Sequence, residues 1–393
     1  MVSTATLFAL TVWFSTNAVA PALEQARGYS SADIAWLTIG VQLGFVIGTV
    51  VISLTNLADV MNTRLLFALS AALAGASNAA LVLAPDALGA ALAARISTGI
   101  FLGGVYPPGM KIVSGWFRSG RGIAIGGMIA ALTLGSGSPH LLRSVFVAQW
   151  ELTIYISSVV AVLGGALVYF HAGDGPYDVP ATRFNPRYML SALTNRAQRL
   201  VLFGYLGHQW ELYTMWAWIG AFLASVYEPT PLIGDSLDLA SLIAFLVFLA
   251  GAIGSLAAGY LAERFGRTAV TSWAMGISGG VALFIGFLPG GWTVVIGIVA
   301  LVWGASVIAD SAQFSTALTE LSEEAYRGTA LTFQTGAGFL LTIVTIKLVP
   351  VIADSAGWGL AFALLGIGPV AGIYAMLRLR ALPESAALAL GKR

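Results

Sequence analysis

Long apolar stretches alternate with short polar turns along the whole chain. A helix needs roughly 20 mainly apolar residues to cross the hydrocarbon core of a bilayer. By this criterion the pattern predicts a membrane-spanning helix in each of twelve ranges: 4–23, 34–54, 65–84, 88–117, 122–147, 152–171, 200–227, 237–262, 268–288, 292–318, 328–353 and 360–379. The apolar runs are continuous and not alternating, which excludes a transmembrane β-barrel. The expected fold class is therefore an all-α polytopic membrane protein.

The longest polar interval divides the predicted helices into two sets of six. We expect an N-terminal six-helix bundle over residues 1–171, a cytoplasmic linker over 172–199, and a C-terminal bundle over 200–393 that ends in a short cytoplasmic tail. Leu57-Ala58-Asp59 and Leu261-Ala262-Glu263 occupy equivalent places in the two halves, and the segments 121–124 and 327–330 do so at nearly the same spacing. The two matches favour an internal duplication, with chance similarity of Ala-rich tripeptides as the alternative. Six-helix repeats are typical of carriers that bind solute near the midplane.

The composition supports a membrane protein and gives its orientation. The chain is 58% hydrophobic and only 9% charged, whereas soluble domains carry about 25% charged residues. With the N-terminus inside, 14 of the 19 basic residues lie on the cytoplasmic side and only Arg27 lies clearly outside. This asymmetry predicts both termini in the cytoplasm and residence in the cytoplasmic (inner) membrane. No basic residue precedes the first stretch, so we interpret it as a retained helix and not a secretory signal.

Several classes of function are excluded by what the sequence lacks. The net charge of +1 gives no reason to expect nucleic acid, and cysteine is absent. The three histidines, at 140, 171 and 208, are too scattered for a zinc signature, and no phosphate-binding Gly-x4-Gly-Lys segment is present. No nucleophile–base pair or metal constellation is evident. We expect a monomer that is not an enzyme and that needs no cofactor or metal.

Two motifs resemble the major facilitator superfamily. Residues Gly259–Arg267 read GYLAERFGR, which matches the cytoplasmic loop signature of that family with Glu in place of the usual Asp, and Leu57-Ala58-Asp59 is an eroded first copy. Residues Arg95–Gly99, followed by Gly103-Gly104, resemble the arginine motif of its fourth helix. The resemblance implies twelve helices in two pseudo-symmetric bundles and transport by alternating access. The gating residues that it implies are Asp59, Arg121, Gly259, Glu263, Arg264, Gly266 and Arg267.

Two further segments, Trp13–Asn17 and Gly103–Trp116, resemble the cluster of nitrate, nitrite or cyanate porters. Nitrate porters of that cluster place an anion-binding arginine in the second and eighth helices. Neither of those predicted helices contains arginine here, which argues against nitrate as the substrate.

Ionisable residues within a bilayer cost about 2.5–3.5 kcal/mol each on insertion scales, so each requires an explanation. Arg95 shares a helix face with Gly99 and Tyr106, which together offer a cation and a hydroxyl to a ligand. The alternative is a structural arginine bound to backbone carbonyls. We consider Arg95 and Tyr106 candidates for substrate binding.

The seventh predicted helix carries His208 and Glu211, three residues apart and hence on one side. Glu211 is the first candidate for proton coupling, with His208 as a relay or substrate contact. Asp310 in the tenth helix is the second candidate carboxylate for proton coupling, and Gln313, one turn beyond it, is a candidate substrate contact. The alternative for both positions is a polar pair that holds helices together.

Three neutral residues complete the candidate substrate contacts: Asn17 in the first helix, Trp210 in the seventh and Gln334 in the eleventh. Interhelical hydrogen bonding or lipid contact is the alternative for each of them. His140 in the fifth helix follows a Gly- and Ser-rich bend and could titrate near neutral pH.

The predicted function is a secondary active transporter that moves a small polar solute, an organic or inorganic anion in the first interpretation, by proton-coupled alternating access. Its partners would be the solute, protons and the lipid bilayer. The alternative within carriers is a proton-coupled exporter of amphipathic or cationic drugs, since the Arg95 motif is common in such exporters. A sensor derived from a carrier is a third possibility.

Overall fold

The computed structural model describes residues 1–55, 57–84, 87–117, 121–146, 149–173, 175–177, 191–227, 238–323 and 327–392. Within these ranges the chain is almost entirely helical, and no described residue is in a strand. The helices up to residue 171 are α1 Val2–Leu10, α2 Ser15–Ala18, α3 Ala20–Arg27, α4 Ser31–Thr55, α5 Leu57–Val60, α6 Thr63–Leu83, α7 Leu88–Leu102, α8 Tyr106–Trp116, α9 Arg121–Val145 and α10 Trp150–His171.

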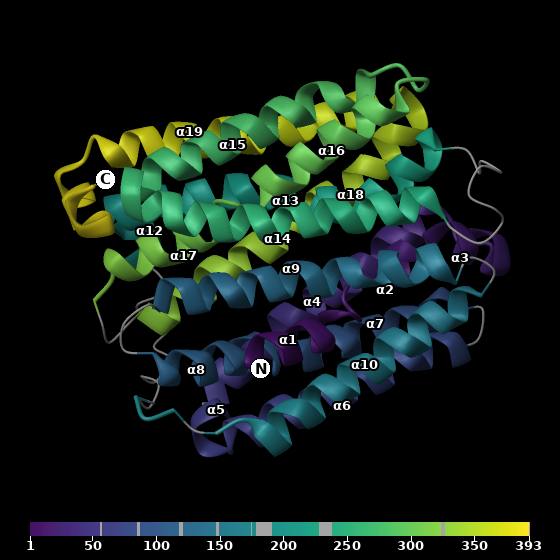
Figure 1. The fold of residues 1–393 in the computed structure, drawn as a ribbon, viewed down its shortest axis with the longest axis horizontal. Coiled ribbons are helices and arrows are strands. Elements are labelled where there is room, and N and C mark those ends of the chain that lie inside the picture. The colour runs from purple at the N-terminus through teal and green to yellow at the C-terminus, as the bar shows by residue number, and fades with distance from the viewer. Residues whose placement is uncertain are drawn as a thin grey trace. The chain divides into compact units, whose positions relative to one another are not determined.

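Among the described residues, the helices that follow α10 start with residue 191 (Figure 1). They are α12 Ser191–Thr194, α13 Arg196–Val226, α14 Leu239–Phe265, α15 Arg267–Phe284, the 3-10 turn η2 Ile285–Phe287, α16 Thr293–Val307, α17 Ser311–Glu320, α18 Arg327–Ala363, η4 Leu364–Gly366, α19 Ile367–Arg380 and η5 Pro383–Gly391.

Every predicted span coincides with one described helix or with two or three consecutive ones, and three spans contain a break of three or four residues. The first breaks at residues 11–14 between α1 and α2, the fourth at 103–105 between α7 and α8, and the tenth at 308–310 between α16 and α17. The predicted eleventh and twelfth spans run into one another through α18, which turns at Gly357 with a φ of 83°. Only glycine adopts such a φ readily, so this residue permits the reversal.

Eight helical stretches among the described residues are long and apolar enough to cross a membrane. One of them, Arg327–Arg380, is 54 residues long and includes the turn at Gly357, so it covers two predicted spans. The chain is thus a multi-pass membrane protein, whereas the total of twelve crossings stays a prediction.

The helices form two compact units. Unit 1 comprises residues 1–179, 216–249 and 290–293, and unit 2 comprises 180–215, 250–289 and 294–393. The boundary crosses α13 and α14, whose residues 216–226 and 239–249 belong to unit 1. The predicted division at residues 172–199 concerns the sequence repeat, and it stays a prediction.

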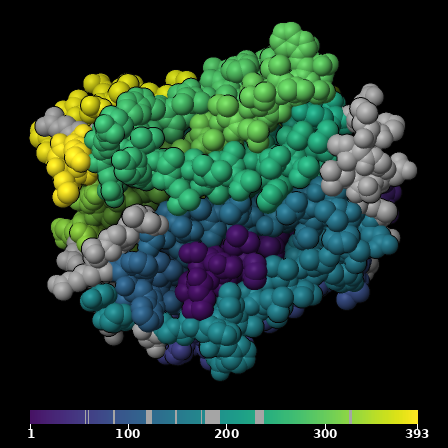
Figure 2. Space-filling view, viewed as in Figure 1, coloured from purple at the N-terminus to yellow at the C-terminus, as the bar shows by residue number. Residues whose placement is uncertain are grey.

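Unit 1 owes its tight packing to glycine on facing helices. A Cβ atom at Gly44 of α4 would collide with the backbone of α7, and one at Gly99 of α7 would collide with the backbone of α4. Small residues allow helix backbones to approach closely in membranes. The face of α7 at Gly99 is therefore filled by α4. The sequence analysis had instead considered this face, with Arg95 and Tyr106, for ligand binding. On one face of the molecule, α1 lies between α9 and α10 (Figure 2).

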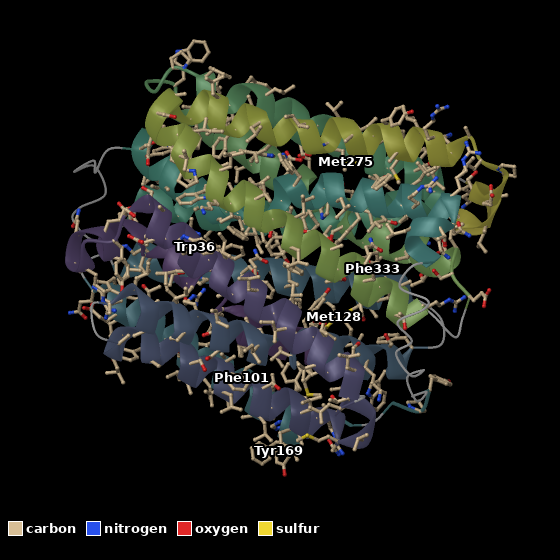
Figure 3. All side chains as sticks on the ribbon, turned by 180° about the vertical axis from the view of Figure 1, so that it is seen from behind. Trp36, Phe101, Met128, Tyr169, Met275 and Phe333 are labelled. Atoms are coloured by element: carbon tan, nitrogen blue, oxygen red, sulfur yellow. The ribbon has the colours of Figure 1, made fainter. Side chains whose placement is uncertain are left out.

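Unit 2 has a core in which α13, α15, α17, α19 and η5 meet, and Met275 and Phe314 are fully enclosed in it. Large apolar side chains elsewhere face outward. Tyr169, 48% exposed, points away from the helices at the edge of the molecule, in contrast to Met275 (Figure 3). Outward apolar side chains on long helices are suited to contact with lipid.

Candidate functional site

Arg95 is fully buried and is bound by the break in the first span. Its Nη1 donates to the carbonyl oxygen of Val12 at 3.0 Å and to Oδ1 of Asn78 at 2.7 Å, and its Nη2 donates to the carbonyl oxygen of Trp13. A third contact joins Nη1 to the hydroxyl of Ser15. The carbonyls at residues 12 and 13 follow the end of α1, where intrahelical donors run out. The contacts thus agree with the structural alternative for this arginine.

Asn78 of α6 extends this network. Its Oδ1 also accepts a hydrogen bond from Ser15 at 2.8 Å, and its Nδ2 donates to the hydroxyl of Ser158 at 3.0 Å. The side chain therefore connects the guanidinium to α2 and α10. A lone asparagine inside an apolar span was the available sequence signal for this role, and the sequence analysis did not use it.

Asn17 lies in α2 and is 4% exposed. Its Nδ2 donates to the hydroxyl of Thr38 at 2.9 Å and to the carbonyl oxygen of Ala217 at 3.1 Å. Both partners belong to unit 1, so Asn17 connects α2 with α4 and with the later part of α13. Tyr106 is half-buried at the first position of α8. Their roles as substrate contacts remain predictions.

Glu211 of α13 is 1% exposed, and each of its carboxylate oxygens accepts a hydrogen bond. Ser278 Oγ of α15 donates to Oε2 at 2.8 Å, and Trp303 Nε1 of α16 donates to Oε1 at 2.7 Å. These two hydrogen bonds offset part of the free-energy cost of burying a carboxylate without a cation. Both donors are uncharged; the hydroxyl of Ser278 could also accept a hydrogen bond, whereas the indole of Trp303 can only donate.

His208 contacts Asp310 across α13 and the start of α17. Nδ1 of His208 lies 2.7 Å from Oδ1 of Asp310, and both side chains are almost completely buried. The contact is at ion-pair distance but lacks regular hydrogen-bond geometry, and Oδ1 accepts no other hydrogen bond. The sequence grouped His208 with Glu211 through their spacing on one helix, whereas the structure joins it to the second candidate carboxylate.

Gln313 and Trp210 bind other parts of unit 2. Gln313 Oε1 accepts from Arg267 at 2.8 Å, and Arg267 also donates twice to Glu320 at 2.6 and 2.7 Å. Trp210 Nε1 donates to the carbonyl oxygen of Leu364 at 3.1 Å. Two predicted substrate contacts therefore make hydrogen bonds within the protein, one of them to a predicted gating residue.

Gln334 of α18 is 1% exposed, and neither its Nε2 nor its Oε1 has a hydrogen-bond partner. Gln209 of α13, which the sequence analysis missed, has an unpartnered Oε1 and donates through Nε2 to the hydroxyl of Tyr205. A Cβ atom at Gly338 would touch the side chains of Tyr205 and Gln209. Gln334 lies one helical turn before Gly338, so it shares the face of α18 that packs on α13.

The loop signature of Gly259–Arg267 is partly explained by the structure. Gly266 has a φ of 94° and precedes α15, so it turns the chain as expected. The close helix approach expected at Gly259 is absent, since a Cβ there would meet no described atom within 4 Å. Gly259 precedes Tyr260, which is 68% exposed on an outward part of α14.

The other residues that were predicted to act in gating have different surroundings. The guanidinium of Arg264 lies over the ring of Phe265, and the Glu263 carbonyl accepts from Lys392 at 2.6 Å. The side chains of Asp59 and Arg121 lie outside the described residues. Sequence reasoning missed Glu320, whose position next to Arg267 depends on the packing of α15 against α17.

His140 of α9 is 1% exposed, and its ring stacks on Phe248 at a centroid distance of 5.8 Å. Its Nε2 has no hydrogen-bond partner. Among the described residues, no group of three or more metal-ligating side chains is present.

The sequence and the fold were compared with those of known proteins. No curated protein sequence matches the chain. A crystal structure of a mutant of the nucleoside transporter NupG is similar, with a TM-score of 0.73, 14% identity, and coverage of 96% of this chain and 98% of that one. The human organic anion transporter MFSD10 (TETRAN) is also similar, with a TM-score of 0.65, 15% identity, and coverage of 95% and 98%. The model of the Major Facilitator Superfamily matches residues 2–234, and the chain therefore belongs to this superfamily of transporters.

Proposed function

We propose that the protein is a secondary active transporter that couples the movement of a small polar solute to protons. The observation that supports this most directly is the pair of buried carboxylates in unit 2. Glu211 is bound by Ser278 and Trp303, and Asp310 contacts His208. Among the described contacts, neither carboxylate pairs with lysine or arginine. Buried carboxyl groups without a fixed cation can gain and lose protons during a transport cycle.

Alternating access is the mechanism that fits such a site. A change in the protonation of Glu211 or Asp310 changes the charge between α13, α15, α16 and α17. Broken helices at membrane depth are common where carriers bind solutes and ions. The break at residues 308–310 places Asp310 at the N-cap position of α17.

The charge of the solute is a separate question. The predicted anion depended on Arg95, but both of its Nη atoms donate to protein oxygens. An anion bound by Arg95 would have to displace those oxygens. The proposal therefore concerns a small polar solute and does not require a negative charge. Export of amphipathic or cationic drugs is the second candidate, since Glu211 and Asp310 could pair with a cation.

The remaining parts of the proposal concern the cellular setting. We place the protein in the cytoplasmic membrane with both termini inside, as a monomer, from the distribution of basic residues. Arg267, Glu320 and Gln313 would form a contact that regulates opening on the cytoplasmic side.

The test is transport by purified protein in liposomes, with uridine and nicotinate as probes and the pH gradient as the variable. We expect the gradient to increase accumulation of at least one probe. Glu211→Gln should abolish gradient-driven accumulation while solute exchange survives, because the side chain keeps its shape but no longer titrates. Glu151→Gln, in the first turn of α10, is the matched control and should behave like the original protein.

Two outcomes would contradict parts of this proposal. Accumulation that is equal with and without the pH gradient would remove proton coupling. Normal gradient-driven accumulation by Glu211→Gln would exclude Glu211 as the proton site. In that case Asp310→Asn should abolish the response, and its failure to do so would exclude both carboxylates.

A further inference from the structure

Buried polar atoms without partners occur on two helices of unit 2, α13 and α18, which pack against each other. They are Nε2 of His208, Oε1 of Gln209, and both amide atoms of Gln334. Each of these residues is no more than 3% exposed. Buried polar groups in folded proteins are nearly always hydrogen-bonded, so several exceptions in one place require an explanation. A ligand that supplies the missing partners is such an explanation.

The side chains that carry these atoms belong to one neighbourhood. The ring of His208 lies 6.0 Å from that of Tyr205 and 5.7 Å from that of Phe314. Gln209 donates to the Tyr205 hydroxyl. Gln334 reaches the same face from α18, because Gly338 one turn later packs against Tyr205 and Gln209. We name Tyr205, His208, Gln209 and Gln334 the amide cluster.

The charges around the amide cluster disfavour an anion. Asp310 contacts His208 directly, and Glu211 lies about one helical turn after His208 on α13. Several basic residues inside the predicted spans have protein partners. Arg95, Lys111 and Arg143 donate to carbonyl oxygens, and Lys347 has its own contact. An anion at the cluster would therefore meet carboxylates without a compensating cation.

The amide cluster has the chemistry to recognise an amide. The terminal group of Gln334 presents a donor and an acceptor side by side, and its best complement is an acceptor beside a donor. The Oε1 of Gln209 adds an acceptor for a second N–H group. A cation could pair with Asp310, but it would leave the Nε2 donor of Gln334 unsatisfied.

We propose that the amide cluster binds an uncharged solute that carries a hydrogen-bond donor and acceptor on adjacent atoms, as in a carboxamide, a urea or a lactam. This assignment rests on the proposed transport function and specifies its substrate class. The rings of Tyr205 and Phe314 meet edge to face at a centroid distance of 6.2 Å, and together they would form an aromatic wall beside a flat ligand of this kind.

The test is ligand stabilisation of the full chain in detergent, measured as a shift in melting temperature with concentration. The probes are matched pairs: acetamide with acetate, nicotinamide with nicotinate, and uracil with orotate, together with the cation 1-methylnicotinamide. At least one uncharged probe should stabilise the protein, and its acid counterpart should bind roughly tenfold more weakly or worse.

Two variants localise the effect. Gln334→Leu and Gln209→Leu should each weaken the uncharged probe by roughly tenfold, the change expected from the loss of a buried hydrogen bond. Either variant suffices if the other fails to fold. Thr153→Val is the matched control, because it removes an equally buried and unpartnered hydroxyl from α10 in unit 1, and it should bind as the original protein does.

The proposal is overturned if the acids or the cation stabilise the protein as strongly as the amides. It is also overturned if no uncharged probe stabilises it, or if both leucine variants bind normally. These results would leave proton coupling intact, since that is measured by accumulation under a pH gradient. Conversely, selective amide binding without gradient-driven accumulation would sustain this assignment and contradict the coupling.

Discussion

Unit 1 and unit 2 each contain a broken helix with a buried charge, and the two charges are opposite in sign. In unit 1 the carbonyls that follow α1 bind the guanidinium of Arg95. In unit 2 the break between α16 and α17 places Asp310 at the N-terminus of α17. A helix carries partial negative charge at its C-terminus and partial positive charge at its N-terminus. Arg95 bonds directly to carbonyls that follow α1, whereas the Asp310 carboxylate makes no capping hydrogen bond to α17 and lies against His208.

The partners differ in a way that matters for function. Arg95 is bound by backbone carbonyls, an amide and a hydroxyl, none of which titrates. Asp310 contacts the imidazole of His208, so both side chains of this pair are ionisable. The first break is therefore bound by groups that do not ionise, whereas the second carries a pair of ionisable side chains.

The largest effect that would test this comparison is expected from Arg95→Leu. Removal of the guanidinium takes the side-chain donor from the carbonyl of Trp13, and it leaves the carbonyl of Val12 and the Oδ1 of Asn78 to share the single hydroxyl of Ser15 in a buried site. We expect a loss of about 3–5 kcal/mol in the free energy of unfolding, since each orphaned group costs about 1–3 kcal/mol. Denaturation of the purified protein in detergent measures it. A stable variant that no longer binds solute would instead assign Arg95 to the substrate site.

A smaller effect is expected from Trp303→Phe, which examines the carboxylate side of the comparison. The substitution removes the indole donor of Glu211 Oε1 and keeps most of the apolar contact with Phe362. We expect a loss of about 1.5–3 kcal/mol, the range for a hydrogen bond to a charged group. Trp273→Phe, at a 52% exposed position, should change stability much less. Equal effects at the two positions would show that the bond to Glu211 does not contribute.

The smallest effect is expected from Trp210→Phe. Trp210 in unit 2, like Arg95 in unit 1, donates to a backbone carbonyl, and this variant tests whether that bond has a structural role. Loss of the bond to Leu364 should cost about 0.5–1.5 kcal/mol and leave probe binding unchanged. Both quantities come from the same melting curves, recorded with and without ligand. Lost binding at unchanged stability would place Trp210 in contact with solute and break the parallel with Arg95.

Much of the fold was predictable because long apolar runs leave few alternatives in a bilayer. The range 34–54 became α4, and the range 152–171 became α10, within a few residues. The break at 11–14 was not predicted, because Val12, Trp13 and Phe14 are as apolar as a continuous helix requires. The residue that accompanies the break is Arg95, whose buried guanidinium binds the carbonyls there. This relation can be recognised only once α7 is known to pack near α1 and α2.

The candidate site was predictable in its residues but not in its pairs. Glu211, His208, Asp310 and Gln334 stand out in the sequence as polar groups within apolar spans, and all four are buried. Helical spacing joins His208 to Glu211, since only neighbours on one helix can be compared without a structure. The contact with Asp310, about a hundred residues later, depends on how α17 packs against α13. The bond between Arg267 and Glu320 was missed for the same reason.

The hydrogen bond between Trp303 and Glu211 also gives the molecule an internal optical sensor. An indole that donates to a carboxylate in a dry environment changes its emission when the negative charge beside it disappears. Among the 11 tryptophans, this one is fully enclosed and joined to a candidate proton carrier. The difference between the fluorescence of the original chain and that of a chain without this indole would therefore follow the ionisation of one group, with no added dye.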